Sequence, residues 1–297
     1  MTVQDIESFL TVVKTGSLTK SAQILFVTQP ALSRRLRSLE EEVGFPLITR
    51  QPGVRQITLT EKGKAFLTIA EQWLRLWQET IELRDEAPVQ RLAIASIESI
   101  NIYILAPVCR LFMREHPTLQ LALKNQYSSQ AYQDVSNGLV DLGIINNVQH
   151  MKGIDCLPAF QETMYFVCRR DYRSGEAPVH PQDLDASRGI YVPWSVDFEV
   201  WYRYWFSNSI PCRLYAQNIP LLQEYILEED IWTIAPSSVT QSLLKHPNIA
   251  AYTLESAPPD RISYFLIKHG NQPLYFSKFC RRLKESLELY PGIEVLY

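Results

Sequence analysis

The side chains with the clearest chemical role in this chain are Gln, Ser and Arg residues of the segment 28–50, which reads TQPALSRRLRSLEEEVGFPLITR. Thr28 can cap a helix, because its hydroxyl accepts a hydrogen bond from a free N–H of the first turn. Pro30 fits that same turn, where a missing N–H costs nothing. Leucines then recur at spacings of four and three, which predicts one buried helix face. These leucines are Leu32, Leu36 and Leu39.

The opposite face of this helix suits the major groove of DNA. It carries Gln29, Pro30, Ser33, Arg34 and Arg37. Arg and Gln can read base edges, whereas Ser and Thr hydroxyls can hold phosphates. We therefore expect Gln29, Pro30, Ser33 and Arg34 to contact bases or the nearby backbone, with Arg37 on the same face. Phosphate contacts are expected from Ser17, Thr28 and Arg50.

The neighbouring segments complete a helix-turn-helix. Ser17 can cap a short helix whose apolar side includes Ala22, and Phe26-Val27 forms a tight connection to Thr28. A preceding helix has a capping-box pattern at Thr2 and Asp5. The β-branched residues of 48–60, interrupted by Pro52 and Gly53, predict a hairpin or wing that exposes Arg50 and Arg55. The alternative is an ordinary three-helix cluster with a solvated basic face.

The combination resembles the N-terminal domain of the LysR-type transcriptional regulators. The matching residues are Phe9, Gly16, Ser17, Leu18, Ser21, Ala22, the run 28–34, Leu36, Leu39, Glu40, Gly44, Pro46, Leu47, Arg50 and the run 59–63. The resemblance implies a winged helix-turn-helix DNA-binding domain at 1–60, a linker or dimerisation helix with a hinge at 61–87, and an effector-binding domain at 88–297. It also implies a partly palindromic promoter site and a homodimer or homotetramer.

Composition agrees with a localised DNA-binding patch. Residues 1–64 hold nine Lys and Arg against six Asp and Glu, whereas the remainder holds twenty against twenty-six. A mildly basic head on an acidic body fits a local nucleic-acid face rather than a globally basic coat. At 297 residues, the chain is long enough for two or more domains.

A long helix is expected from Thr60 to about Arg84. Apolar residues alternate spacings of three and four along it, as in a heptad seam, and a second stripe lies beside the first. The seam is Phe66, Ile69, Trp73, Leu76, Thr80 and Leu83, and the second stripe is Leu67, Ala70, Leu74, Trp77 and Ile81. Such a helix needs partners on two sides. It is either buried within one domain or, as the resemblance implies, pairs two chains.

Beyond the expected hinge at 85–88, strands and helices alternate, which predicts a mostly parallel, doubly wound α/β sheet. The long extended stretch 157–169 is typical of a crossover into a second lobe. The resemblance implies two α/β lobes around a cleft, like a periplasmic solute-binding protein. Lobe I would comprise about 88–162 and 268–297, and lobe II about 163–267. Glu228-Glu229-Asp230 departs from the small residues and glycine of many relatives.

Ligands of open α/β sheets bind at the carboxyl ends of strands. The expected effector contacts at those ends are Ser96, Glu98, Ser99, Ser128, Asn146, Trp194, Ser195 and Asn218. Ser99 and Ser128 match positions where relatives place Ser or Thr against a small anion, although both could be plain helix caps. Glu98 would repel an anion or pair with an amino group. Trp194 could stack on a ring, or it could pack in the core with its aromatic neighbours.

Other classes of protein find less support. The five cysteines, an odd number without a CxxC motif, favour buried thiols over disulfides, zinc or redox sensing. The chain lacks the GxSxG, P-loop, HExxH and GxGxxG motifs of common enzymes, and nothing predicts a metal or cofactor. No signal peptide or membrane span is evident, which favours a cytoplasmic location over a transport-type solute-binding protein. We therefore expect a DNA-binding regulator that is not an enzyme, whose promoter binding or DNA bending responds to a small-molecule effector.

Overall fold

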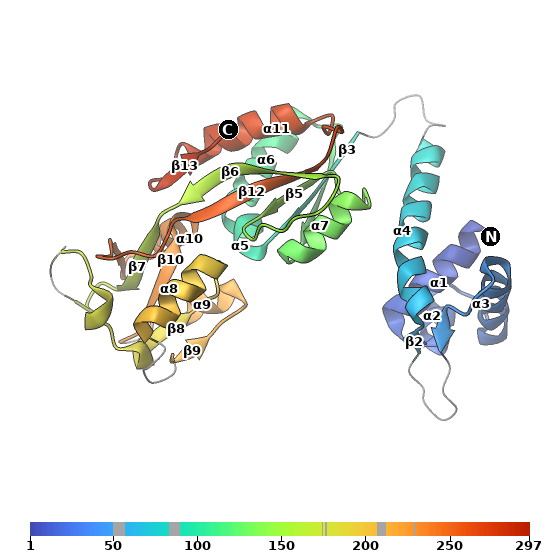
Figure 1. Cartoon of the computed structure of the whole chain (residues 1–297), viewed down its shortest axis with the longest axis horizontal. Coiled ribbons are helices and arrows are strands. Elements are labelled where there is room, and N and C mark those ends of the chain that lie inside the picture. The colour runs from blue at the N-terminus through green and yellow to red at the C-terminus, as the bar shows by residue number, and fades with distance from the viewer. Residues whose placement is uncertain (50–56, 83–89, 174, 176, 207–211, 229) are drawn as a thin grey trace. The chain divides into compact units, whose positions relative to one another are not determined.

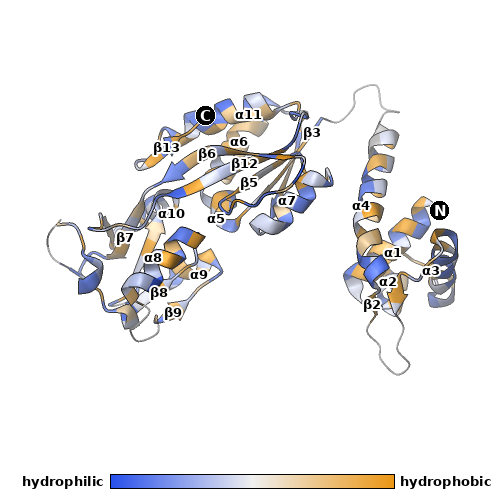
Figure 2. Ribbon diagram, in the orientation of Figure 1, coloured by the Kyte–Doolittle hydropathy of each residue, from blue (hydrophilic) through white to orange (hydrophobic). Residues whose placement is uncertain are grey.

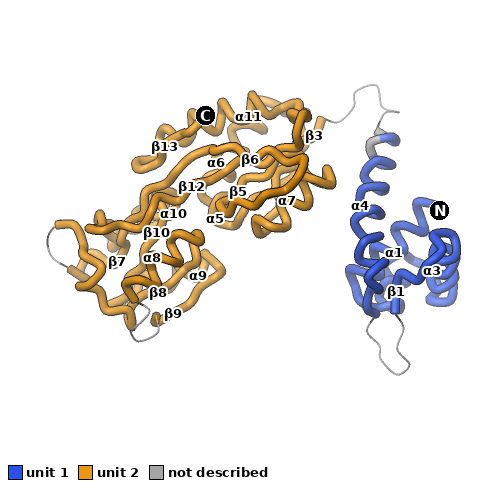
Figure 3. The backbone as a smooth tube through the Cα atoms, viewed as in Figure 1, with its two compact units in different colours: residues 1–89 blue, residues 90–297 orange. Residues whose placement is uncertain are grey.

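The computed structural model describes residues 1–49, 57–82, 90–173, 175, 177–206, 212–228 and 230–297. The chain forms two compact units, residues 1–89 and 90–297, which are blue and orange in Figure 3. The expected hinge at 85–88 lies outside the described residues, as do Arg50, Pro52, Gly53 and Arg55 of the expected wing.

The first unit contains the predicted helix-turn-helix. Its helices are α1 (Val3–Thr15), α2 (Leu18–Ile24) and α3 (Gln29–Val43). The predicted caps are confirmed. Thr2 and Asp5 form a capping box, Ser17 accepts from the Lys20 N–H at 3.4 Å, and Thr28 accepts from the Ala31 N–H at 3.4 Å. Each cap satisfies a donor that the first turn leaves free, so the helices begin where the sequence indicates.

A two-stranded sheet and a long helix follow. The strands β1 (Ile48–Thr49) and β2 (Thr58–Leu59) pair antiparallel, and helix α4 (Glu61–Glu82) continues from β2. Glu40 of α3 fixes the start of β1, because its carboxylate accepts from the backbone N–H groups of Leu47 at 2.8 Å and Ile48 at 3.1 Å. The sheet that leads into the expected wing is therefore tied directly to helix α3.

One apolar core holds the first unit together. Leu32, Leu36 and Leu39 of α3 are at most 1% exposed and pack with residues of α1, α2 and the first half of α4. The rest of α3 is coloured mainly hydrophilic in Figure 2. Further along α4, Leu76, Trp77 and Ile81 are exposed. The buried half of α4 thus belongs to the first unit, and its outer half presents apolar side chains without cover from this unit.

The second unit consists of two lobes, each built on one sheet (Figure 1). The described strands of lobe I form a six-stranded sheet in the order β13-β6-β12-β5-β3-β4. These strands are β3 (Arg91–Ser96), β4 (Gln120–Asn125), β5 (Leu142–Ile145), β6 (Ile154–Glu162), β12 (Arg261–Lys268) and β13 (Ile293–Val295). Its helical segments are α5 (Glu98–Ile100), η1 (Asn101–Leu105), α6 (Ala106–Glu115), α7 (Ser128–Ser136) and α11 (Phe276–Leu287).

Helices cover both faces of the lobe I sheet. Alternate residues of a strand point to opposite faces, so one strand contributes to the apolar clusters on both sides. Leu92 and Ile94 of β3 pack in the cluster with α6 and α11, whereas Ala93 and Ala95 pack in the cluster with α7. A strand buried on both sides needs the continuous apolar run that β3 has. The doubly wound arrangement that the sequence predicts is confirmed for this lobe.

Lobe II has a smaller sheet. Its described strands are ordered β11-β7-β10-β8-β9, with one apolar cluster around them. The strands are β7 (Met164–Arg169), β8 (Gly189–Tyr191), β9 (Leu214–Tyr215), β10 (Trp232–Pro236) and β11 (Ile249–Tyr252). The helical segments are η2 (Pro181–Asp183), η3 (Ala186–Arg188), α8 (Val196–Phe206), α9 (Ile219–Tyr225) and α10 (Ser237–Leu243). Asp230, in the turn that departs from relatives, has a left-handed backbone with φ of 58°.

The expectation of mostly parallel sheets is wrong. Only β3, β4 and β5 of lobe I are mutually parallel, whereas β12 pairs antiparallel with both β5 and β6. The reason is that β6 carries the chain out of lobe I into β7, and β12 brings it back. The chain therefore rejoins the sheet of lobe I at Arg261, the first residue of β12.

Two helices begin next to the cleft. Only Ile97 separates the end of β3 from α5, which begins at Glu98 and continues through the π-helix η1 into α6. Helix α7 begins at Ser128, shortly after β4 ends at Asn125. Both helices therefore start at the carboxyl ends of their strands, with Glu98, Ser99 and Ser128 in the first turns.

Candidate functional site

The first candidate site is the outer face of α3. Gln29, Pro30, Arg34 and Arg37 are exposed and Ser33 is half-buried. Pro30, Ser33, Arg34 and Arg37 are three or four residues apart, so they share one side of the helix. Thr28 is exposed at the N-terminus and Ser17 is half-buried at the cap of α2. Seven of the eight expected DNA contacts thus lie on α3 or at the N-caps of α2 and α3, and the eighth, Arg50, is outside the described residues.

The second candidate site is a cavity of about 600 Å³ between the two lobes of the second unit. A cavity of this size suits a small organic ligand. Fifteen of the twenty-one lining residues are polar or charged, namely Glu98, Ser99, Asn125, Gln126, Tyr127, Ser128, Ser129, Asn146, Asn147, Gln149, Ser195, Glu199, Gln217, Asn218 and Arg261. The remaining lining residues are Ile97, Val192, Pro193, Trp194, Val196 and Ile219.

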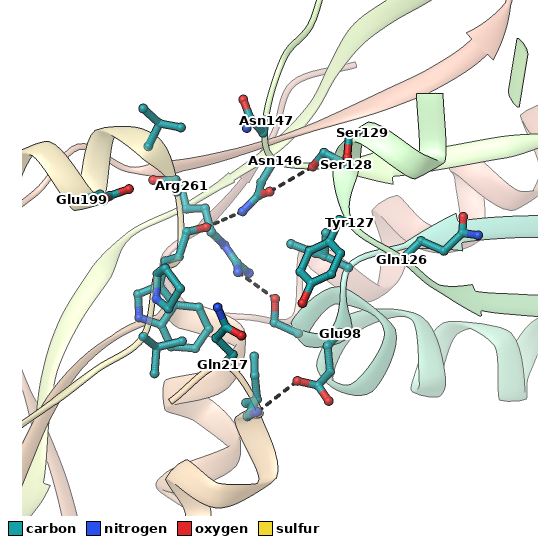
Figure 4. A pocket seen from close by; sticks show the side chains of 18 of the residues that line it. Glu98, Gln126, Tyr127, Ser128, Ser129, Asn146, Asn147, Glu199, Gln217 and Arg261 are labelled. Carbon is teal, nitrogen blue, oxygen red and sulfur yellow. Dashed lines mark hydrogen bonds between the residues drawn. The ribbon is translucent and has the colours of Figure 1, made fainter. Parts of the chain in front are cut away.

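Hydrogen bonds join the two lobes across this cavity (Figure 4). The Glu98 carboxylate of lobe I accepts from the backbone N–H of Ile219, the first residue of α9 in lobe II, at 3.0 Å. Asn146 of lobe I donates from its side-chain amide to the Trp194 carbonyl of lobe II. Gln223 of α9 donates to the Tyr103 hydroxyl at 3.0 Å. The lobes are therefore held together around the cavity by polar contacts that a ligand can exchange or reinforce.

A buried ion pair forms part of the wall. Arg261 donates to the Glu162 carboxylate from Nε at 3.1 Å and also from Nη2, and the two side chains are 1% and 0% exposed. Arg261 Nη1 donates to the Ser99 hydroxyl at 2.8 Å, and Glu162 accepts from the Ser238 N–H at 2.9 Å. The guanidinium also lies 5.6 Å from the ring centre of Trp194. The pair thus ties α5, β6, β12 and α10 into one network.

Seven of the eight expected effector contacts line this cavity. Ser96 does not belong to the lining among the described residues, because it is fully buried at the end of β3 and donates to the Ile97 carbonyl at 3.1 Å. Ser99 and Ser128 do not cap their helices. The N-cap positions are Ile97 and Tyr127, and Ser128 instead donates to Asn146 at 3.4 Å.

The aromatic residues of lobe II serve mainly as packing. Trp194 is 2% exposed, belongs to the lobe II core and donates from its indole N–H to the Ile234 carbonyl at 2.6 Å. Its buried ring offers little surface for stacking on a ligand. Ser195 caps α8 by accepting from the Phe198 N–H at 3.1 Å, and the Asn218 side chain makes no capping bond. Glu98 takes that capping role for α9 from the opposite lobe.

Fourteen of the twenty-one lining residues are not among the expected contacts, and two of them matter most for the chemistry of the cavity. Arg261 reads as the first residue of a returning strand, and only a buried pairing with a residue 99 positions away reveals its place in the wall. Tyr127 lies between β4 and α7, and its side chain is 76% exposed at the cavity. Its position directly after a strand end was the signal that could have found it.

Family models match both parts of this architecture. The model described as "Bacterial regulatory helix-turn-helix protein, lysR family" matches residues 3–64, and the model described as "LysR substrate binding domain" matches residues 85–288. The chain belongs to the LysR family.

Curated relatives of this LysR-family chain are transcriptional regulators. It is 29% identical over 174 residues to the uncharacterized HTH-type transcriptional regulator YbhD of Escherichia coli K12, covering 57% of this chain and 54% of that protein. It is also 29% identical over 175 residues to the Hca operon transcriptional activator HcaR of the same organism, with 58% of each chain covered. The chain spans about half the length of the curated relatives that it matches.

Solved structures share the fold. The LysR family transcriptional regulator CbnR has a TM-score of 0.72 at 20% identity, covering 96% of this chain and 99% of CbnR. A full-length OxyR variant from Pseudomonas aeruginosa has a TM-score of 0.66 at 18% identity, covering 98% and 96%. CbnR also has a structure with its target DNA, which matches with the same TM-score and identity.

The cysteines of the LysR-family chain are free thiols. Burial raises the pKa of Cys109 to about 11 and that of Cys168 and Cys280 to about 12, which disfavours the reactive thiolate. Among the described residues, no three His, Cys, Asp or Glu side chains gather as metal ligands. None of the described helices combines the length and apolarity needed to cross a membrane.

Proposed function

We propose that this protein is a DNA-binding transcription regulator whose promoter binding responds to a small-molecule effector. The observation that carries the proposal is the capped, solvent-facing side of α3 within a domain matched by a helix-turn-helix family model. In this proposal Arg34 and Gln29 read base edges, with Pro30 and Ser33 against bases or backbone and Arg37 beside them. Ser17, Thr28 and Arg50 hold phosphates.

A second copy of the chain fits the outer half of α4. Ile69 and Leu76 are each 55% exposed, and Trp77 is 40% exposed. Pairing these side chains with their equivalents in another chain would bury an apolar stripe that one copy leaves in water. A dimer, or a tetramer made of two dimers, would then present recognition helices to successive major grooves.

The interlobe cavity is the proposed effector site. The proposal is supported by seven expected contacts in its lining, namely Glu98, Ser99, Ser128, Asn146, Trp194, Ser195 and Asn218. A ligand that bridges the lobes would change how tightly they close, and this would alter the spacing or bend of bound DNA through the paired linker helices. We assign no catalytic role and no cofactor to the protein, and we propose a cytoplasmic location, where a DNA target would be within reach.

The test begins with duplexes selected from a random library by the full-length chain. We expect affinity for the selected sequence to fall steeply with salt, because phosphate contacts release counterions. Arg34→Ala should reduce preference for the selected over a random duplex by roughly five- to hundredfold. Arg281→Ala, which removes one exposed arginine from the second unit, is the charge-matched control. Failure of the full chain to prefer any sequence would overturn the regulator proposal. Equal weakening on both duplexes in Arg34→Ala would remove Arg34 from base reading.

A further inference from the structure

The charges around the interlobe cavity are unevenly compensated. Among the described lining residues, the charged side chains are Glu98, Glu199 and Arg261. Glu199 forms an ion pair with Arg203 one helical turn along α8. Arg261 is neutralised by Glu162 in the buried pair. Glu98 is therefore the one charged lining residue for which the described residues supply no partner of opposite charge.

Two donors in the cavity wall are already engaged. The guanidinium of Arg261 already gives two hydrogen bonds to Glu162 and one to Ser99. The backbone N–H of Ile219, at the start of α9, is taken by Glu98 Oε2. An anionic ligand at the start of α9 would meet the Glu98 carboxylate that is already bound there. This like-charge contact would weaken binding.

Glu98 and Tyr127 together offer what a cation needs. Glu98 Oε1 accepts no hydrogen bond from the described residues, so one carboxylate oxygen is available for a charge-assisted hydrogen bond. Tyr127, 76% exposed, projects into the cavity near Glu98 from the same lobe (Figure 4). A tyrosine ring and a carboxylate that line the same cavity suit an ammonium group, because the ring quadrupole attracts a cation.

We propose that the effector of this protein carries an ammonium group, which binds between the Glu98 carboxylate and the Tyr127 ring. This assignment rests on the proposed function of the cavity and names the ligand class that the cavity selects. The apolar side chains of Val192, Val196 and Ile219 favour a short hydrocarbon body attached to the amine. The hydroxyls and amides of Ser128 and Asn146 suit a second polar group. A monoamine and a zwitterionic amino acid share the required chemistry.

Matched probes separate the two kinds of amine from a simple acid. The aliphatic set is butylamine, 4-aminobutyrate and butyrate, and the aromatic set is phenethylamine, phenylalanine and hydrocinnamate. Full-length protein is heated with each probe at 10 mM and the melting temperature of the second unit is measured. We expect members with an ammonium group to raise it by a few degrees, and the acids not to. If only 4-aminobutyrate or phenylalanine acts, the effector is zwitterionic.

Glu98→Gln tests the role of the charge. The amide oxygen can still accept from the Ile219 N–H, so the lobe contact survives while the negative charge is lost. We expect the dissociation constant of the best amine, measured by calorimetry, to rise roughly ten- to hundredfold. Glu224→Gln is the matched control, because Glu224 is exposed on α9 and is not among the lining residues. Tyr127→Leu should also weaken the amine while keeping an apolar side chain.

Three results would overturn the ammonium assignment. They are stabilisation by the acids in preference to the amines, the absence of any response to the amine-bearing probes, and an unchanged amine affinity in Glu98→Gln. Sequence-selective DNA binding, measured on the same preparations, separates this outcome from failure of the regulator proposal. A chain that selects DNA but responds to acids keeps its proposed function and loses the ammonium site. A chain that binds amines but selects no DNA keeps the ammonium site and loses its proposed function.

Discussion

Arg261 and Glu162 are directly opposite each other on the antiparallel strands β12 and β6, at the point where the chain passes between the lobes. Their side chains are almost completely removed from solvent. Two charges taken out of water are tolerated only when each satisfies the other, so the pair constrains both strands at the crossover. The same pair positions Ser99 in the cavity wall through Arg261 Nη1.

The first prediction follows from this pairing. Arg261→Met should lower the free energy of unfolding of the second unit by about 3–5 kcal/mol, because Glu162 is left buried without a counter-charge. Adding Glu162→Gln should recover most of this loss, since the amide can still accept from the Ser238 N–H. Urea unfolding of the wild type, both single variants and the double variant gives the coupling energy. A double variant no more stable than Arg261→Met would contradict the argument.

The second prediction concerns Gly63, in the first turn of α4. A Cβ atom added at this position would lie 2.0 Å from the backbone carbonyl oxygen of Leu47, which cannot move aside as a flexible side chain can. Gly63→Ala should therefore destabilise the first unit by about 3 kcal/mol through overpacking. Lys64→Ala, at an exposed neighbouring position, is the control and should change stability by less than about 0.5 kcal/mol. Equal melting curves for the two variants would show that α4 shifts freely away from Leu47.

Local chemistry explains which parts of the fold could be predicted. The caps at Thr2, Ser17 and Thr28 depend on bonds to residues three positions away, so the sequence contains all that they need. The leucine spacing of α3 similarly predicts which face of this helix is buried. For the described residues, these local features were enough to predict almost all of the first unit.

The cavity depends on relationships that no local pattern records. Glu98 and Ile219 are 121 positions apart, and Glu162 and Arg261 are 99 apart. The rule that ligands bind at the carboxyl ends of strands correctly placed Glu98, Ser128 and Asn146 at one edge of the lobe I sheet. It succeeded because it follows from the topology of β3, β4 and β5. The rule failed for Ser96, whose hydroxyl donates to the neighbouring Ile97 carbonyl. It could not reveal Arg261, because this residue reaches the cavity from the antiparallel strand β12.

The third prediction concerns Phe26, in the turn between α2 and α3. Its side chain is 97% exposed, and its φ of 53° lies in the left-handed region that disfavours residues with a Cβ atom. Phe26→Gly should raise the free energy of unfolding of the first unit by about 1 kcal/mol. Phe26→Ala keeps the Cβ and should give no such gain. Thermal unfolding of the two variants isolates the backbone effect, because both remove the same exposed ring. Equal stabilities would exclude backbone strain at this turn.

The fourth prediction is a loss of stability at alkaline pH caused by Cys109. Burial raises the pKa of its thiol to about 11, whereas in the unfolded chain the thiol has a pKa of about 8.5. Below pH 8.5 both states keep the proton and the thiol causes no pH dependence. Between about pH 8.5 and 11 the unfolded chain loses the proton first, so stability falls as pH rises, by up to about 1.4 kcal/mol per pH unit.

Cys109→Ala should therefore flatten this decline, even though the smaller side chain lowers stability at neutral pH. Val108→Ala is the matched control, because Val108 is equally buried on α6 but does not ionise, and its loss should lower stability by the same amount at every pH. Urea unfolding at pH 7.5, 9 and 10 measures the three slopes. Parallel slopes for the wild type and Cys109→Ala would mean that this thiol titrates alike in the folded and unfolded chains.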